Sequence, residues 1–114
     1  MVDVRTDFEG DSCLIDIRGE VDASSSIYLD EALQTAANAD VKTILVNCQE
    51  LNYISSAGLG VFMSYIQEFE AQNKKMVLYH MSEKVYKVFE IVGLHQLLTI
   101  VDTEEQAKTS SHEL

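Results

Sequence analysis

Basic side chains are scarce in this sequence. Its 114 residues include 8 Lys and Arg against 19 Asp and Glu, which gives a formal net charge of -11 at pH 7. Such a charge repels nucleic acid and anionic lipid, so neither is expected as a partner. The acidic surface would instead steer a partner with a basic face toward the protein, or serve solubility alone.

Long apolar runs and paired cysteines are missing as well. No apolar run approaches the ~20 residues of a membrane-spanning helix. The N-terminal residues have neither the basic lead nor the apolar core of a secretion signal, so we expect a cytoplasmic location. Cys13 and Cys48 form no CxxC pair and lie in apolar runs, which indicates buried structural thiols.

Signatures of enzymatic and metal chemistry are also absent. The sequence has no GxxxxGK[ST] phosphate-binding loop, no GxSxG nucleophile elbow and no metal-ligand spacing. His80, His95 and His112 share no constellation, and we interpret them as structural or surface residues. A response-regulator receiver would need an aspartate where the third strand ends in Asn47-Cys48. We therefore predict a protein that is not an enzyme and holds no metal or cofactor.

The sequence does contain alternating strand and helix patterns. Alternating or continuous apolar residues predict strands, and apolar residues at helical spacing predict helices. The predicted strands are 2–8, 12–18, 43–48, 76–80 and 98–101, and the predicted helices are about 24–37, 59–69, 83–92 and 103–108. Leu59, Phe62, Met63, Ile66 and Phe69 are the expected buried stripe of the second helix, and Val92 belongs to that of the third.

This order is typical of an α/β fold. We predict one domain over residues 1–114, with a mixed, mostly parallel sheet of about five strands and about four helices. Residues 109–114 are expected to be a frayed tail.

The most informative stretch is NYISSAGLGVF, residues 52–62. Ser55 or Ser56 is the natural N-cap of the helix that follows, and a helix start suits an anion, so a phosphate on a serine there would be tolerated. Glycine is a poor helix former. We interpret Gly58 and Gly60 as clearance for a molecule that must touch the serines, the alternative being close packing against the sheet.

Sites in sheets of this kind lie beyond the carboxyl ends of the strands. Both serines lie in such a loop, and Asp22 directly follows the second predicted strand. Asp22 could approach the serines if the second and third strands are neighbours. Asp22 or Ser24 could also cap the first helix.

Two segments together resemble the signature of STAS domains, the anti-sigma factor antagonist family. NYISSAGLGVF resembles the family's loop, in which an acid or serine, a serine, a small residue, glycine and leucine open a helix. GEVDASSS, residues 19–26, is similar to the family's Gly-Glu-aliphatic-Asp segment before the first helix. The resemblance covers nearly the whole chain, including its length and its order of elements.

The resemblance implies a regulator that exchanges partners. In this family the unphosphorylated antagonist binds an anti-sigma factor, a serine kinase of the GHKL ATP-binding type, and so frees the sigma factor. The kinase phosphorylates a loop serine, which ends the binding, and a metal-dependent serine phosphatase resets the protein. By position the modified residue is Ser56, with Ser55 as the alternative because many antagonists have an aspartate at that position. The implied partner-binding residues are Asp22, Ser24, Ser55, Ser56, Ala57, Gly58, Leu59 and Gly60.

Two other functions stay open at this point. STAS modules also serve in stressosome scaffolds, transporters and lipid-transport complexes. The chain could therefore be a phosphorylation-independent subunit in which both serines only cap the helix. A small enzyme with a nucleophilic loop serine is the other alternative, and it would need a base that the sequence does not show near the serines.

Overall fold

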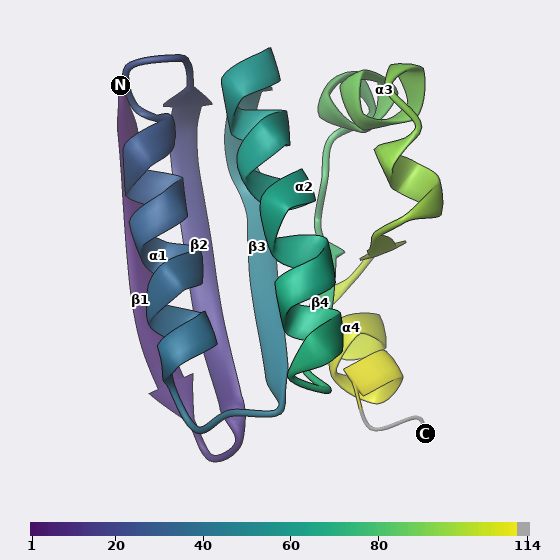
Figure 1. Cartoon of the computed structure of the whole chain (residues 1–114). Coiled ribbons are helices and arrows are strands. Elements are labelled where there is room, and N and C mark those ends of the chain that lie inside the picture. The colour runs from purple at the N-terminus through teal and green to yellow at the C-terminus, as the bar shows by residue number, and fades with distance from the viewer. Residues whose placement is uncertain (112–114) are drawn as a thin grey trace.

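Five strands form one sheet in chain order, as the computed structural model of the protein shows for residues 1–111 (Figure 1). The strands are β1 Val2–Glu9, β2 Ser12–Val21, β3 Thr43–Ile54, β4 Lys75–Tyr79 and β5 Thr99–Val101. β1 is antiparallel to β2, and every other pair of neighbours is parallel. The mixed, mostly parallel sheet of the predicted α/β fold is thereby confirmed.

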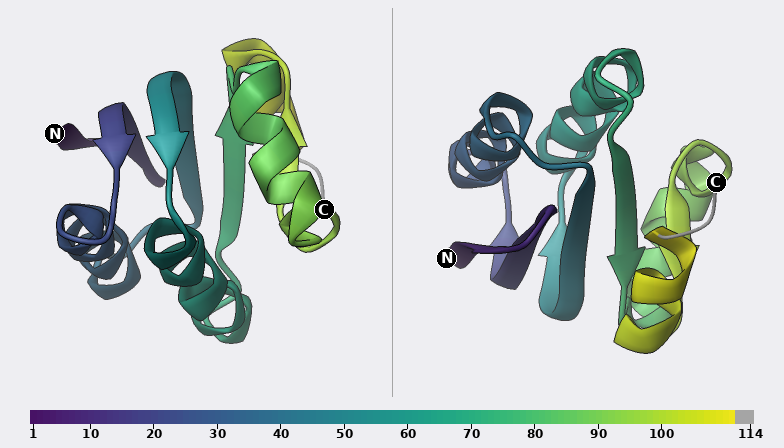
Figure 2. Two further views of the ribbon diagram at one scale, coloured as in Figure 1. Left: turned by 90° about the horizontal axis from the view of Figure 1, so that it is seen from above. Right: turned by 90° about the horizontal axis from the view of Figure 1, so that it is seen from below.

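The helices lie on both faces of this sheet. They are α1 Ser26–Asn38, α2 Ser56–Ala71, α3 Glu83–Ile91 and α4 Glu104–Ser111, with a short 3-10 helix η1 at Leu94–Gln96. α1 and α2 run side by side on one face, and α4 covers the opposite face (Figure 2). α3 packs against α2 through the rings of Phe62 and Phe89, whose centroids are 5.8 Å apart. No helix among residues 1–111 has the length and apolar character to cross a membrane.

The two faces of the sheet explain the strand patterns. Cys13, Ile15 and Ile17 of β2 alternate with less buried residues and point into the larger core under α1 and α2. Leu45 of β3 and Val77 of β4 belong instead to a smaller core with Ala107 of α4. Because central strands are covered on both sides, β3 begins with a continuous apolar run.

The two cysteines are buried free thiols, as predicted from their apolar surroundings. Desolvation by burial raises the pKa of Cys13 to about 11 and that of Cys48 to about 12. Both groups therefore stay protonated at neutral pH and act as small apolar side chains.

The structure corrects several expected boundaries. β2 runs to Val21 and not to 18, and α2 is Ser56–Ala71 and not 59–69. β3 does not stop at residue 48 but pairs with β2 as far as Ile54, through two register shifts. Parallel backbone pairing holds this extension as a strand although its exposed side chains are polar. α1 begins at Ser26 and not at 24. α4 includes 109–111, which had been assigned to a frayed tail, and Lys75 Nζ donates to Ser110 O at 2.7 Å. The rest of that tail, 112–114, lies outside the described residues.

Two residues assigned to buried helix stripes are on the surface. Met63 and Val92 are both 51% exposed, whereas Tyr65, which was not in the stripe, is buried. Tyr65 turns inward because α1 offers hydrogen-bond acceptors for its hydroxyl, which lies 3.0 Å from Gln34 Oε1 and 3.3 Å from Asp30 O. A partner for the polar tip makes tyrosine a core residue at this position.

Candidate functional site

Ser55 is the N-cap of α2. It follows β3 in an extended conformation, and its hydroxyl accepts a hydrogen bond of 3.3 Å from the backbone N–H of Gly58. Its own N–H donates to Val21 O at 2.8 Å. Ser55 is therefore half-buried and engaged at both its backbone and its side chain. Of the two serines that could have capped the helix, the structure selects this one.

Ser56 is the first residue of α2, and it is exposed. Within residues 1–111 its hydroxyl has no hydrogen-bond partner, and the backbone N–H groups of Ser56 and Ala57 donate none either. Free N–H groups at a helix N-terminus carry partial positive charge. The free hydroxyl of Ser56 thus lies at a helix end that can receive an added anionic group.

Gly58 is required for packing and does not provide clearance for a partner. It is buried, and a Cβ atom there would lie 2.7 Å from Cγ1 of Ile54 and 2.8 Å from Cγ1 of Val21. The helix therefore approaches the strand ends too closely for any side chain. This corrects the expectation for Gly58, which followed from helix propensity alone. Leu59 is also buried, so both residues lie on the side of α2 that faces the core.

Gly60 differs from Gly58. It is exposed, and a Cβ atom added there would meet nothing within 4 Å. No packing contact explains this glycine. It leaves the outer side of α2 flat one turn beyond Ser56.

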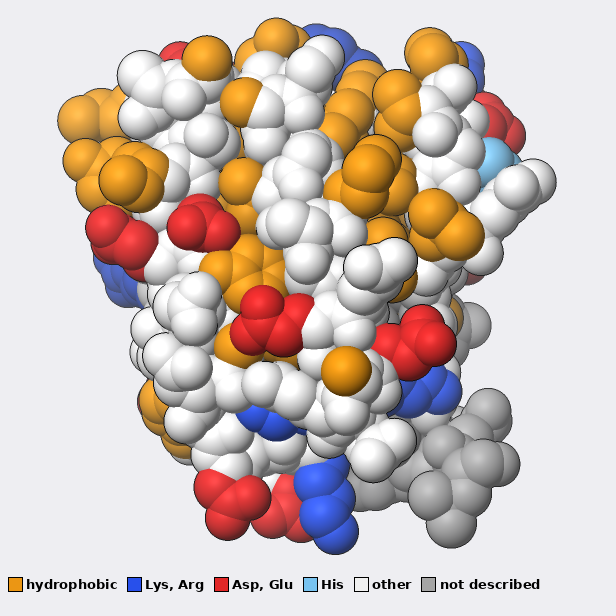
Figure 3. All heavy atoms as spheres, viewed as in Figure 1, with side chains coloured by type: hydrophobic (Ala, Val, Ile, Leu, Met, Phe, Trp, Pro, Cys, Tyr) orange, Lys and Arg blue, Asp and Glu red, His pale blue; other side chains and the backbone are white. Residues whose placement is uncertain are grey.

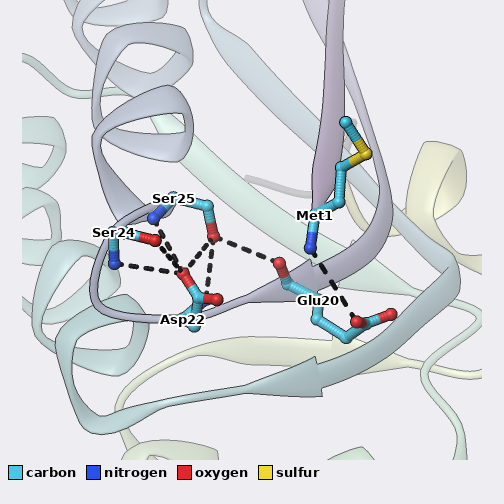
Figure 4. Close-up of polar contacts among 5 residues, drawn as sticks. All are labelled: Met1, Glu20, Asp22, Ser24 and Ser25. Carbon is cyan, nitrogen blue, oxygen red and sulfur yellow. Dashed lines mark hydrogen bonds and ion pairs between the residues drawn. The ribbon is translucent and has the colours of Figure 1, made fainter.

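Asp22 organises the start of α1 (Figure 4). Its Oδ1 atom accepts from the N–H groups of Ser24 and Ser25, at 3.0 and 2.9 Å, and lies 2.9 Å from each of their hydroxyls. The bonds from the hydroxyls of Ser24 and Ser25 are the main cause that lowers the pKa of Asp22 to about 2. Asp22 is thus ionised at neutral pH, and its Oδ2 atom accepts no bond from residues 1–111.

Ser25 is a member of this network that the sequence interpretation missed. It is buried, its hydroxyl accepts from Asp22 N at 2.9 Å, and the same hydroxyl lies 3.1 Å from Glu20 O. The signal in the sequence is the Asp-x-Ser-Ser spacing, because Asp and Ser side chains bond the backbone two or three residues away. Neither residue proposed from the sequence as a cap is the N-cap of α1: that position is Ser25, whose side chain makes no capping bond. Asp22 instead holds the turn before the helix together with Ser24 and Ser25.

The first residue of the GEVD segment, Gly19, has a backbone conformation that favours glycine. Its φ angle is +101°, a left-handed conformation that favours glycine. β2 shifts its register against β3 between Gly19 and Glu20, and a side chain at Gly19 would meet the backbone oxygen of Met1. The N–H of Glu20 donates to the same oxygen at 3.0 Å. The Glu20 carboxylate also lies 3.8 Å from the amino group of Met1 (Figure 4). The segment therefore shapes the end of β2 that carries Asp22.

The two loops lie at one edge of the sheet. β2 and β3 are neighbours, with Val21 opposite Ile54, as the placement of Asp22 near the serines required. No hydrogen bond within residues 1–111 joins Asp22 to Ser55 or Ser56. The arrangement presents an ionised carboxylate and a free hydroxyl on adjacent loops, without a hydrogen bond between them.

The two histidines among residues 1–111 pack against aromatic rings. His80 and His95 pack beside Tyr79 and Tyr86, with ring centroids 5.0 and 6.1 Å apart, and within residues 1–111 neither histidine bonds to Ser55 or Ser56. His112 lies outside the described residues. In the same range no group of three His, Cys, Asp or Glu side chains is arranged to bind a metal ion.

Comparisons with known proteins agree with this picture. The anti-sigma-B factor antagonist of Listeria monocytogenes is 31% identical over 98 residues, covering 84% of this chain and 86% of that protein. The unphosphorylated anti-sigma factor antagonist SpoIIAA has a TM-score of 0.80 and 27% identity, with 95% of both chains covered. Its phosphorylated form from Bacillus has a TM-score of 0.73 and 26% identity, covering 95% of this chain and 98% of that chain. The family model of the STAS domain matches residues 3–107, and this chain belongs to the STAS domain family.

Proposed function

We propose that this chain is an anti-sigma factor antagonist whose binding is ended by phosphorylation of Ser56. The proposal rests on the different structural roles of the two serines. Ser55 caps α2 with its hydroxyl, whereas Ser56 is exposed with a hydroxyl that bonds nothing within residues 1–111. A kinase can reach Ser56 without breaking a contact of the fold. The relatives named as antagonists, one of them solved in a phosphorylated form, support the same function.

The partners follow from this proposal. The sequence has no GxxxxGK[ST] phosphate-binding loop, so we expect another protein to transfer the phosphoryl group from ATP to Ser56. The family resemblance implies that this protein is a GHKL-type serine kinase that is itself the anti-sigma factor. A serine phosphatase would reset the switch. We expect the protein and these partners to share the cytoplasm.

The switch needs no refolding of this domain. A phosphate on Ser56 would stand in solvent at the start of α2, near the free N–H groups of Ser56 and Ala57. It adds about -1.5 to -2 charges to a surface that is already acidic. Burying such a charge without a partner costs roughly 2 to 5 kcal/mol at an interface. Because 1.4 kcal/mol is about a factor of ten, binding would weaken some thirty-fold or more.

Intact-mass measurement after incubation with the cognate kinase and ATP tests the proposal. The wild type and Ser55→Ala should gain one phosphate, and Ser56→Ala should gain none and stay bound to the kinase. Ser56→Asp, which carries less charge than a phosphate, should remain folded and bind weakly. A phosphate that persists on Ser56→Ala and is lost from Ser55→Ala would move the site to Ser55. An unmodified wild type would favour the phosphorylation-independent subunit.

A further inference from the structure

β1 is an open edge of the sheet. It pairs with β2 on one side, and no strand among residues 1–111 pairs with its other side (Figure 1). Proteins usually blunt such edges with proline, bulges or very short strands, because an open edge can pair with another chain. β1 has eight residues without proline, and its register with β2 has no shift. The other edge strand, β5, has three residues, so β1 is the edge that is long enough to pair.

Every second residue of β1 turns its backbone groups toward this open edge. The two-residue turn 10–11 joins β1 to β2, so the closing pair of Glu9 and Ser12 is hydrogen-bonded, and such pairs recur at every second residue. The series continues to residue 1, where the N–H of Glu20 donates to Met1 O at 3.0 Å. The backbone groups that face outward are therefore those of Val2, Val4, Thr6 and Phe8.

One of these outward groups is already occupied. The N–H of Phe8 donates to Oδ1 of its neighbour Asp7 at 3.0 Å. Val2, Val4 and Thr6 remain, and within residues 1–111 their backbone N–H groups donate to no side chain or loop. Three residues of the edge are thus available to another strand.

The charged residues of β1 restrict which strand can pair there. Asp3, Arg5 and Asp7 alternate in sign along one face of the strand. An antiparallel copy of the same strand, centred on Val4, places Asp3 opposite Arg5 of the other copy and Arg5 opposite Asp3. Moving the centre by one residue, to position 3 or 5, sets equal charges opposite each other, which is unfavourable. The strand is therefore complementary to itself in one register.

We propose that β1 pairs antiparallel with β1 of a second copy of this chain, with Val4 on the twofold axis. Val2 then faces Thr6 of the other copy, Val4 faces Val4, and Thr6 faces Val2. Each of these three pairs exchanges two hydrogen bonds, so every free outward group is used. A centre at Thr6 would need the N–H of Phe8, which is already bonded. The two five-stranded sheets become one continuous sheet.

Two exposed aromatic side chains lie where this pairing would cover them. Phe8 is 49% exposed, and it lies on the sheet face that α1 covers, as do Val2 and Val4, which pack against the core. The proposed register places Phe8 beside the start of β1 of the other copy. That is the end of the sheet where α1 begins and where Tyr28, which is 54% exposed, lies.

Tyr28 is on the side of α1 that borders the open edge. Tyr28 and Asp30 project from opposite flanks of the helix, on either side of the buried Leu29. Because the Tyr65 hydroxyl of α2 reaches Asp30 O, the flank of Tyr28 is the one toward β1. Figure 3, seen in the same direction as Figure 1, shows orange side chains along this edge of the molecule. Contact between Phe8 and Tyr28 of the two copies would bury both rings.

The pairing leaves the serine loop open. Ser56 follows β3, which is separated from the open edge by β2, so it stays exposed in the dimer. The net charge of -11 opposes the approach of two copies, and we therefore expect a weak dimer that depends on concentration. A dimer carries two copies of the Ser56 site, which raises its avidity for a partner with two binding sites.

Sedimentation velocity over a wide range of protein concentrations tests the pairing. The wild type should be a monomer when dilute and a dimer when concentrated. Asp3→Arg and Arg5→Asp should each raise the dimer dissociation constant about tenfold or more, because two attractive pairs become two repulsive ones. The two changes together exchange the charges and should restore the dimer. Glu9→Arg is the control: it changes the net charge as Asp3→Arg does, but it lies beyond the paired segment and should not weaken the dimer.

Amide hydrogen exchange measured by NMR locates the interface. The N–H groups of Val4 and Thr6 should be protected in concentrated and not in dilute protein, whereas that of Arg5, which faces β2, should be protected in both. Thr6→Pro removes one outward N–H and no bond to β2, so it should abolish the dimer while the domain still unfolds cooperatively.

Three results would overturn the inference. They are a wild type that stays monomeric at every concentration, a dimer that the charge exchange does not restore, and a dimer in which Val4 and Thr6 stay unprotected. The antagonist function is tested separately, because Asp3→Arg should accept phosphate on Ser56 as the wild type does.

Discussion

The backbone N–H of Ser55 donates a hydrogen bond of 2.8 Å to the carbonyl oxygen of Val21. This bond joins the residue before Ser56 to the residue before Asp22. Two loops that are more than thirty positions apart are thereby fixed at one edge of the sheet (Figure 1). The ends of β2 and β3 therefore hold the candidate site together. We expect neighbouring residues there to differ in their effect on the stability of the domain.

The two serines should differ in their effect on stability. Ser55→Ala removes the hydroxyl that caps α2 and should lower the free energy of unfolding by about 1 kcal/mol. Ser56→Ala removes a hydroxyl without a hydrogen bond in residues 1–111 and should change it by less than about 0.5 kcal/mol. Urea denaturation of both variants measures the difference. Equal losses would show that Ser56 also caps the helix.

The two glycines form a second matched pair. Gly58→Ala should destabilise the domain, because its methyl group would meet Ile54 and Val21 at distances that force a shift, and overpacking costs about 1–3 kcal/mol. Gly60→Ala should stabilise it by about 0.5–1 kcal/mol, since alanine is the better helix former and has open space. Thermal unfolding of the two variants and the wild type measures both changes in stability. A stabilised Gly58→Ala would mean that the helix start can move away from the strands.

Asp22 should titrate far below an ordinary aspartate. Its pKa in the folded protein is about 2, whereas an unperturbed aspartate has a value near ~3.9. Since the folded value is the lower one, its contribution to stability is fully present above pH ~4 and is lost as the pH falls toward 2. A carboxyl NMR titration should show this value in the wild type and a higher one in Ser24→Ala and Ser25→Ala. Unchanged titration in both variants would show that the hydroxyls do not hold the carboxylate.

Much of the fold can be predicted from the sequence, because period and burial coincide in the strands and helices. The apolar run at 43–48 lies in a central strand, and the order of elements is as expected. The extension of β3 to Ile54 could not be predicted, since its exposed polar residues show no strand pattern and are held by the pairing with β2. The exposure of Met63 and the burial of Tyr65 depend on where α1 offers a hydrogen-bond acceptor.

The site was predictable as a location, and less so in its detail. The serine loop and Asp22 lie at the same edge of the sheet because parallel strands bring their carboxyl ends together. Which serine caps α2 depends on backbone dihedral angles that two adjacent serines do not distinguish. The role of Gly58 depends on Val21, a residue of another strand, so helix propensity alone led to the wrong interpretation.

Lys74 should matter for stability far from the site. Its Nζ atom donates to Ala36 O, Ala37 O and Ala39 O, at 2.9, 2.9 and 2.8 Å, and so closes the C-terminal end of α1. Lys74→Met leaves these carbonyls without that donor and should cost about 1–3 kcal/mol. Lys84→Met, at an exposed position of α3, is the control and should be nearly neutral. Equal effects in denaturant titrations would mean that water replaces the ammonium at no loss.

The acidic surface should raise the rate at which the protein associates with the kinase. If the net charge of -11 steers the kinase, the on-rate should fall as salt rises, because ions screen attraction over about 8–10 Å at 0.1–0.15 M. The off-rate should change less, since it depends on contacts that form after encounter. Stopped-flow measurements between low and physiological salt separate the two rates. A salt-independent on-rate in the wild type would mean that the charge serves solubility alone.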